Sequence, residues 1–266
     1  MEVGGFHRRR PAREAGLAGG RWRVEAVPEL GDLLGAEAPG GCQPRAAPAP
    51  LTRAAAGRPA ARGATRRACP GSRRARPDVL LLHGQAFTSK TWETLGTLAL
   101  LAEEGYRAVA IDLPGHGDSP PSDAVATERG RVALLDHVLR ELALRRPVLV
   151  SPSMSGRFAV PFLLARGARL AGFVPIAPAG TAEHPAQRYR QLQTPTLIVY
   201  GDGDAGLGPR ALRRLRLLPR HRVAVLRGAG HACYVQRPRD FHSVLLAFLR
   251  QLGPRGTAVA PRPDPR

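Results

Sequence analysis

Residues Pro147–Phe158 read PVLVSPSMSGRF, an apolar run that ends abruptly in three serines. The run Val148–Val150 is typical of a buried strand, and the serines follow at positions 151, 153 and 155. A nucleophilic serine at the end of a strand needs small residues two positions before and after it, because strand and helix approach closely there. It also needs a backbone N–H on the next residue, which can donate to an oxyanion. These two requirements separate the three serines.

Only the middle serine meets both requirements. Ser151 is followed by Pro152, which has no N–H. Ser155 has the bulky Arg157 at its second following position. Ser153 is flanked at both distances by serine, so the usual Gly-x-Ser-x-Gly pattern has become Ser-x-Ser-x-Ser. A serine brings a Cβ that glycine lacks, so we expect a tighter fit of strand against helix.

Around this stretch, apolar runs alternate with helical stretches. The runs are Val79–Leu82, Ala108–Ile111, Val148–Val150, Phe173–Ile176, Thr196–Tyr200 and Arg222–Leu226. The helical stretches include Thr91–Glu104, which ends at Gly105, then Glu128–Leu144, and a final helix with apolar residues on one face from Phe241 to Leu249. This alternation predicts an α/β fold, a mostly parallel sheet flanked by helices. Only the residues from Pro178 to Gln193 lie between the fourth run and the fifth, where a lid would be inserted, so we expect a minimal lid or none.

Polar side chains with catalytic chemistry lie just past the predicted strands. Ser153 follows the third run, Asp204 the fifth and His231 the sixth. Ligands of parallel sheets bind at the carboxyl ends of strands, and the chain order Ser…Asp…His is that of α/β-hydrolases. The sequence therefore predicts a triad of these three residues, with Met154 as the donor of an oxyanion N–H. Asp202 is the weaker candidate for the acid, because it lies nearer its strand.

Composition excludes several other classes of protein. The 266 residues carry a formal net charge of +19, almost all of it from arginine, since Lys90 is the only lysine. The basic residues are scattered and form no zinc-finger, basic-zipper or RNP motif, so we expect no specific nucleic-acid partner. Cys42, Cys69 and Cys233 are too widely spread for a disulfide framework or a metal site. We expect a reducing, cytoplasmic location and, without an apolar run of about 18 residues, no transmembrane anchor.

Composition also divides the chain. Residues 1–76 are rich in Arg, Ala, Gly and Pro, which predicts disorder with one possible strand at Arg21–Val27. Residues 77–252 form the predicted hydrolase domain. The tail, residues 253–266, is predicted to be disordered as well.

Within residues 77–252, six stretches resemble the α/β-hydrolase domain-containing protein 14 subfamily of the α/β-hydrolase superfamily, the A type more than the B type. They are LLLHGQAFTSKTWETLGTL, GYRAVAIDLPGHGDS, VLVSPSMSG, GFVPIAPAGT, TPTLIVYGDGD and GAGHACY. The resemblance implies Ser153 as nucleophile, Asp204 as acid and His231 as base. It implies Gln85 and Met154 as the oxyanion-hole backbone donors.

The resemblance also implies an activity. It implies hydrolysis of small acyl esters and, for the B type, transfer of an acetyl group from protein lysine to coenzyme A. Coenzyme A as acyl acceptor is thus the one cofactor expected, and a small acyl compound the expected substrate. The A type is similar to membrane-anchored proteins, and this sequence shows no such apolar anchor. The alternative is a catalytically weak binding or scaffold protein with the same fold; haloalkane or epoxide chemistry would need aspartate at position 153.

Overall fold

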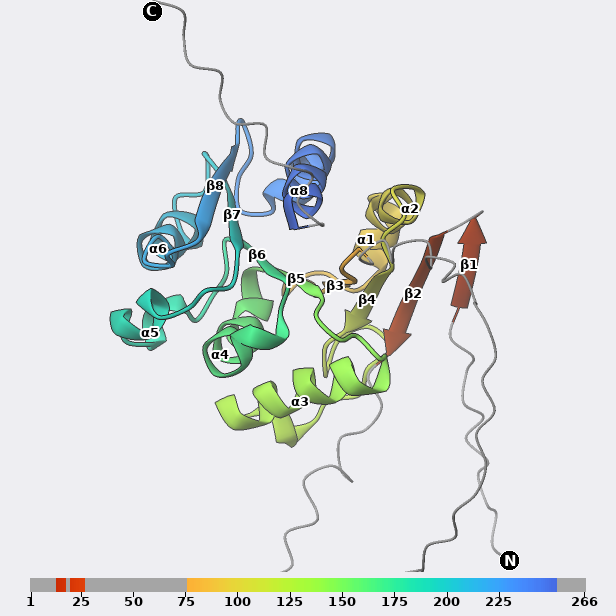
Figure 1. The fold of residues 1–266 in the computed structure, drawn as a ribbon, viewed down its shortest axis with the longest axis horizontal. Coiled ribbons are helices and arrows are strands. Elements are labelled where there is room, and N and C mark those ends of the chain that lie inside the picture. The colour runs from red at the N-terminus through yellow and green to blue at the C-terminus, as the bar shows by residue number, and fades with distance from the viewer. Residues whose placement is uncertain (1–12, 18–19, 27–75, 253–266) are drawn as a thin grey trace, which may run out of the picture.

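The computed structural model describes residues 13–17, 20–26 and 76–252 (Figure 1). Within these ranges eight strands form one sheet, in the order β1-β2-β4-β3-β5-β6-β7-β8. The strands are β1 (Arg13–Leu17), β2 (Gly20–Ala26), β3 (Val79–Leu81), β4 (Ala108–Asp112), β5 (Val148–Pro152), β6 (Gly172–Ile176), β7 (Thr196–Gly201) and β8 (His221–Leu226). Only β1 pairs antiparallel with its neighbour, so the predicted mostly parallel sheet is confirmed.

Helices connect the successive strands from β3 to β8, as parallel pairing requires, and the last two helices follow β8. They are α1 (Lys90–Thr94), α2 (Thr97–Glu103), α3 (Glu128–Glu141), α4 (Gly156–Arg166), α5 (Ala186–Arg190), α6 (Leu207–Leu215), α7 (Cys233–Gln236) and α8 (Pro238–Leu252). Figure 1 shows α3, α4, α5 and α6 on one side of the sheet, with α1, α2 and α8 on the other. The six apolar runs of the sequence coincide with β3 to β8.

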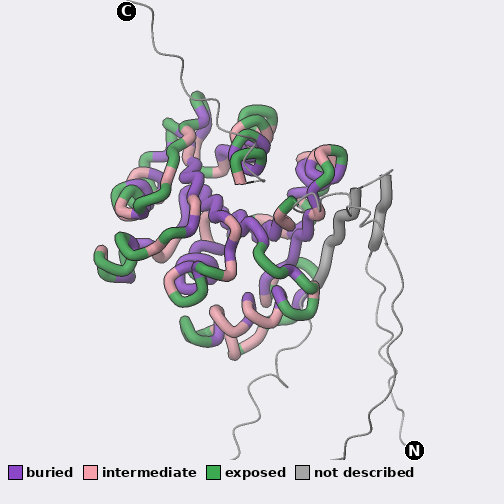
Figure 2. The backbone as a smooth tube through the Cα atoms, viewed as in Figure 1, coloured by how far each residue is buried: buried purple, intermediate pink, exposed green. Residues whose placement is uncertain are grey.

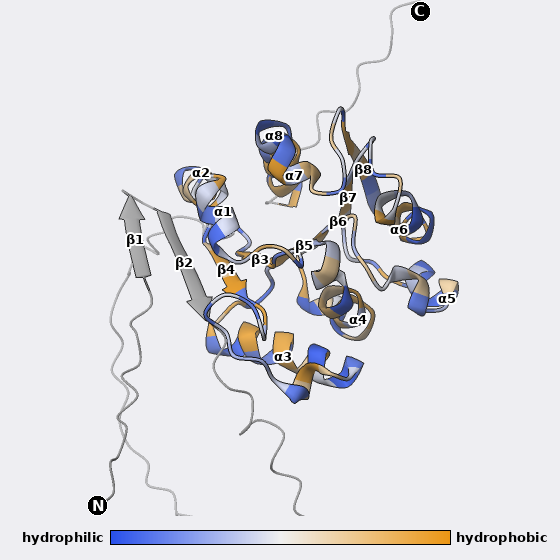
Figure 3. Ribbon diagram, turned by 180° about the vertical axis from the view of Figure 1, so that it is seen from behind, coloured by the Kyte–Doolittle hydropathy of each residue, from blue (hydrophilic) through white to orange (hydrophobic). Residues whose placement is uncertain are grey.

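The core has two layers, one on each face of the sheet. In β3, Leu80 packs with the residues of α3, α4 and α6, while Val79 and Leu81 pack with those of α1, α2 and α8. A strand covered on both faces has no polar side, which is why its sequence is a continuous apolar run. The strands in the middle of the sheet are accordingly buried (Figure 2). Figure 3 shows α3 with both hydrophobic and hydrophilic residues, as expected for a helix with one face on the sheet.

Two predicted helices differ from the observed ones. The single helix predicted at Thr91–Glu104 is divided into α1 and α2, because Gly96 adopts a left-handed φ of 71° between them. The helix predicted to reach Leu144 ends at Glu141, since Ala143 has a φ of 50° and the N–H of Leu144 donates back to the Leu139 carbonyl at 2.8 Å.

The region before Arg76 contributes two strands to the sheet. The strand predicted at Arg21–Val27 corresponds to β2, which lies beside β4. The range 1–76, predicted to be disordered, thus contains β1 and β2. Its other residues before Arg76 lie outside the described residues, as does the tail 253–266, and their disorder stays a prediction. In the part of the chain that is described, no helix is both long enough and apolar enough to span a bilayer.

Candidate active site

Ser153 stands at the sharp turn between β5 and α4. β5 ends at Pro152, a short 3-10 turn covers Ser153–Ser155, and α4 begins at Gly156. Ser153 has a φ of 50°, which is uncommon for a residue with a side chain. Such a backbone conformation costs on the order of 1–3 kcal/mol and persists only where the surrounding structure holds it. The turn leaves Ser153 and Met154 partly exposed between the buried Pro152 and Ser155.

The two flanking serines are fitted into the turn by hydrogen bonds. The Ser155 hydroxyl donates to the carbonyl of Pro152 at 2.8 Å, and its oxygen lies 3.1 Å from the Ser151 hydroxyl oxygen. Since Ser155 has one hydroxyl proton, Ser151 must be the donor of the second bond. Both side chains are buried and satisfied, so serine in place of glycine leaves no unpaired hydroxyl here.

The closest approach of the helix falls at Gly156. A Cβ at this position would lie 2.4 Å from the carbonyl oxygen of Ala179 and 2.6 Å from the Cβ of Pro178. The N–H of Ala179 in turn donates to the carbonyl of Ser153 at 2.8 Å. Sequence reasoning placed the tight contact at Ser151 and Ser155 and missed Gly156. The glycine directly after the serines was the signal that could have indicated it.

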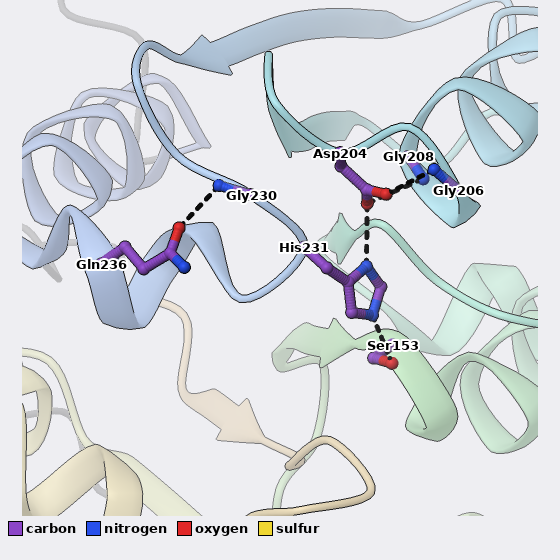
Figure 4. A network of polar contacts seen from close by, with 7 residues as sticks. All are labelled: Ser153, Asp204, Gly206, Gly208, Gly230, His231 and Gln236. Atoms are coloured by element: carbon purple, nitrogen blue, oxygen red, sulfur yellow. Dashed lines mark hydrogen bonds and ion pairs between the residues drawn. The ribbon is translucent and has the colours of Figure 1, made fainter.

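The three residues of the predicted triad meet (Figure 4). Nε2 of His231 lies 2.8 Å from the hydroxyl oxygen of Ser153, and Nδ1 lies 2.8 Å from Oδ2 of Asp204. Asp204 comes from the loop after β7, and His231 from the loop between β8 and α7. The imidazole therefore bridges a hydroxyl and a carboxylate, the arrangement in which a histidine can accept a proton from serine.

Asp204 is buried and fully engaged. Its Oδ1 accepts the N–H of Gly206 at 2.8 Å, and its Oδ2 accepts the N–H of Gly208 at 3.0 Å as well as the contact from His231. Burial alone would raise the pKa of this carboxyl, but the hydrogen bonds from His231, Gly206 and Gly208 hold the pKa below its ordinary value. Asp204 is thus ionised at neutral pH, and it orients His231 with Nδ1–H toward itself and Nε2 free to accept.

Asp202, the weaker candidate for the acid, instead binds backbone N–H groups of the loop that follows β8. Its Oδ1 accepts the N–H of Gly228 at 2.8 Å and that of Ala229 at 3.4 Å. The N–H of Gly203 donates to the Ala229 carbonyl at 2.9 Å. These bonds tie the loop after β7 to the loop that carries His231.

The histidine loop is also held from α7. Oε1 of Gln236 accepts the N–H of Gly230 at 2.6 Å (Figure 4). The ring of Tyr234 stacks on Trp92 with centroids 4.9 Å apart. Trp92 donates from Nε1 to the carbonyl of Leu82 at 2.8 Å, at the end of β3. One aromatic pair thus links α7, which follows the histidine loop, to the segment that follows β3.

That segment passes next to Ser153. A Cβ on Gly84 would lie 3.6 Å from the Cβ of Ser153, and Gln85 follows on the exposed side. His83 is fully buried, and its Nε2 accepts the N–H of Leu113 at 3.0 Å. Nδ1 therefore carries the proton and donates to the Gly84 carbonyl at 2.9 Å. Burial lowers the pKa of His83, which agrees with a neutral ring that fixes this segment.

The two predicted oxyanion donors flank the serine in this arrangement. Met154 directly follows Ser153 in the 3-10 turn, and Gln85 directly follows Gly84. Their donation to a substrate oxygen stays a prediction. Among the residues that the structure describes, no group of three His, Cys, Asp or Glu side chains could hold a metal ion. What the site offers is a hydroxyl, an imidazole and an ionised carboxylate in contact, the groups that acyl transfer needs.

The chain is similar in sequence to known α/β-hydrolases. Residues 79–185 match the model of the Alpha/beta hydrolase family. The chain is 56% identical over 177 residues to "Protein ABHD14A" of Danio rerio and of Homo sapiens, and 66% of the chain is aligned. The aligned part spans 66% and 65% of those two proteins, just under two thirds of their lengths. The chain is also 50% identical over 189 residues to human "Putative protein-lysine deacylase ABHD14B", and this alignment covers 70% of the chain and 90% of that protein.

Two solved structures are similar in fold. The crystal structure named "predicted CIB-like hydrolase from Thermoplasma acidophilum" superposes with a TM-score of 0.62 at 25% identity, over 67% of this chain and 88% of that one. Carboxylesterase CesB (YbfK) of Bacillus subtilis gives a TM-score of 0.58 at 22% identity, over 66% and 84%. The second likeness concerns the fold alone.

Proposed function

Since this chain belongs to the alpha/beta hydrolase family, and within it to the ABHD14 group with the A-type proteins more similar, we propose that it is a serine hydrolase of small acyl esters or amides. The observation that carries the proposal is the contact series Ser153–His231–Asp204, with both contacts at 2.8 Å. The left-handed φ of Ser153 supports it further, because strained backbone is typical of functional sites.

The first half of the reaction makes an acyl-enzyme. His231 takes the hydroxyl proton of Ser153 at Nε2, and the serine oxygen bonds to the acyl carbonyl carbon. The carbonyl oxygen becomes an oxyanion, which the N–H groups of Met154 and Gln85 stabilise by about 3 kcal/mol each. When the oxyanion collapses, the bond to the leaving group breaks, and His231 returns its proton to that group. Asp204 stabilises the imidazolium throughout.

The second half repeats these steps with another acceptor. Water, activated by His231, attacks the acyl-enzyme and releases a carboxylic acid and free Ser153. The acyl group is proposed to be small because the segment from Pro178 to Gln193 holds only the 3-10 turn Thr181–Glu183 and α5. So short a cover gives little apolar wall for a long acyl chain.

A second candidate activity is deacylation of protein lysine with coenzyme A as the acyl acceptor. The support for lysine deacylation is the name of a relative 50% identical to this chain, "Putative protein-lysine deacylase ABHD14B", and coenzyme A is the acceptor that the resemblance implies. In this reaction the lysine amine leaves in the first half, and the thiol of coenzyme A replaces water in the second. Incubation with an acetyl-lysine peptide and coenzyme A should yield acetyl-coenzyme A by mass spectrometry, and the Ser153→Ala variant should yield none.

The test of the hydrolase proposal is covalent labelling. A fluorophosphonate probe should label the wild-type chain and the Ser155→Ala variant, but not Ser153→Ala. Persistent labelling of Ser153→Ala would remove this residue as the nucleophile. A folded wild type that is neither labelled nor active would favour the alternative, a binding protein with this fold. Turnover of p-nitrophenyl octanoate without turnover of the acetate would contradict the small-acyl assignment.

A further inference from the structure

A basic hollow lies beside α6, apart from the triad. It has a volume of about 300 Å³ and is lined by Ala182, Arg210, Arg213 and Arg214. The three arginines belong to α6, and Ala182 belongs to the 3-10 turn Thr181–Glu183. None of Ser153, Asp204 and His231 lines it, so the hollow is a separate feature of the molecule.

The arginines converge because of their spacing along α6. Residues three and four positions apart share one face of a helix, so Arg210, Arg213 and Arg214 lie together. The opposite face is apolar and fixed, since Ala211, Leu212 and Leu215 are buried in the core. The helix cannot rotate its basic face away from the hollow without exposing that core.

The charge of this face is uncompensated within the described part of the chain. No ion pair there involves Arg210, Arg213 or Arg214. Glu183, next to Ala182 in the turn, is exposed and forms no ion pair with them. Three like charges on one helix face repel one another, so an anion bound among them would remove an unfavourable interaction.

We infer that this hollow binds a phosphate or pyrophosphate group of a small soluble molecule. Each guanidinium presents a rigid fork of N–H donors that matches the oxygens of a phosphate in pairs. The volume of about 300 Å³ stands at the lower end of the range for ligand pockets, which suits one or two phosphate groups with a small substituent. The inference does not depend on the proposed hydrolase activity, because it uses none of the catalytic residues.

The test compares two variants with equal charge. Pyrophosphate is titrated calorimetrically into the 266-residue chain at fixed ionic strength. The pocket variant carries Arg210→Gln, Arg213→Gln and Arg214→Gln. The control variant carries three glutamines in place of exposed arginines elsewhere, Arg140, Arg145 and Arg239. Both lose three positive charges, so non-specific attraction of anions by the +19 chain falls equally in the two.

We expect saturable binding of one pyrophosphate that weakens by about tenfold or more in the pocket variant and by less than about twofold in the control variant. Equal weakening in both variants would overturn the inference, because the attraction would then be general. Absence of saturable binding to the wild type would overturn it as well. Co-sedimentation with phosphatidic-acid vesicles but no binding of pyrophosphate would overturn the assignment to a soluble ligand. Circular dichroism confirms that both variants are folded.

Discussion

Replacing Asp204 with asparagine tests the proposed acid, because its two carboxylate oxygens have no spare position for an amide. Oδ1 accepts the N–H of Gly206, and Oδ2 accepts the N–H of Gly208 and faces Nδ1 of His231. If the asparagine NH₂ takes the place of Oδ2, it faces the N–H of Gly208, so two donors meet, and it favours the wrong tautomer of His231. If the NH₂ takes the place of Oδ1, it faces the N–H of Gly206 in the same way. Neither rotamer restores the wild-type bonds.

Two magnitudes follow from this conflict. A buried N–H left without an acceptor costs about 1–3 kcal/mol of folding free energy. In a serine protease, the corresponding exchange lowers kcat by about 10⁴-fold, because the histidine no longer presents an acceptor nitrogen to serine. We therefore expect Asp204→Asn to lose about 1–3 kcal/mol in urea unfolding and roughly three to four orders of magnitude in kcat for p-nitrophenyl acetate.

Asp202→Asn is the matched control. Asp202 is exposed, and one of its oxygens accepts the N–H of Gly228, a bond that the asparagine carbonyl can still make. This variant should keep its activity within a few-fold and its stability within about 1 kcal/mol. If Asp202→Asn lost as much activity as Asp204→Asn, the assignment of the acid would be wrong. A folded Asp204→Asn variant with more than about a tenth of wild-type activity would also refute the reasoning.

Three further outcomes are expected. Gly156→Ala should lower the free energy of unfolding by about 1–3 kcal/mol, measured in urea, because its Cβ would meet the Ala179 carbonyl at 2.4 Å; an unchanged midpoint would contradict this. Ser155→Ala should cost about 1 kcal/mol for each of its two hydrogen bonds yet keep fluorophosphonate labelling, and lost labelling in a folded sample would speak against its purely structural role. Hydrogen bonds lower the pKa of Asp204, so its stabilisation is present above about pH 5 and is lost as pH falls through the folded pKa. The gap in unfolding free energy between wild type and Asp204→Asn should therefore narrow as pH falls below about 5, and a constant gap would count against the ionised acid.

Much of the fold could be predicted because its signals are local. Each of β3 to β8 is a short apolar run, and a strand buried on both faces leaves that pattern in any sequence. The positions of Ser153, Asp204 and His231 follow from the same argument, since parallel strands bring their carboxyl ends to one edge. Pro152 excluded Ser151 through a covalent property, the missing N–H, and the bulk of Arg157 excluded Ser155.

The rest depends on contacts between distant residues. Gly156 meets Ala179 only because β6 returns beside β5, and nothing near Gly156 in the sequence fixes that distance. In the sequence Asp202 is a second candidate for the acid, and only the fold brings the N–H of Gly228 within hydrogen-bonding distance of its carboxylate. The break at Gly96 was missed because an isolated glycine is tolerated inside many helices, and only its φ of 71° distinguishes this one.

The stacking of Trp92 on Tyr234 gives the molecule an internal optical reporter. The chain contains two tryptophans, Trp22 and Trp92. Trp92 is fully buried, its indole N–H is bonded to the Leu82 carbonyl, and Tyr234 on its face lies three residues beyond His231. With Trp22 replaced by phenylalanine, the emission of a single indole would follow the polarity at the junction between the histidine loop and the segment of Gln85. Acylation could then be timed in the native chain without an attached dye.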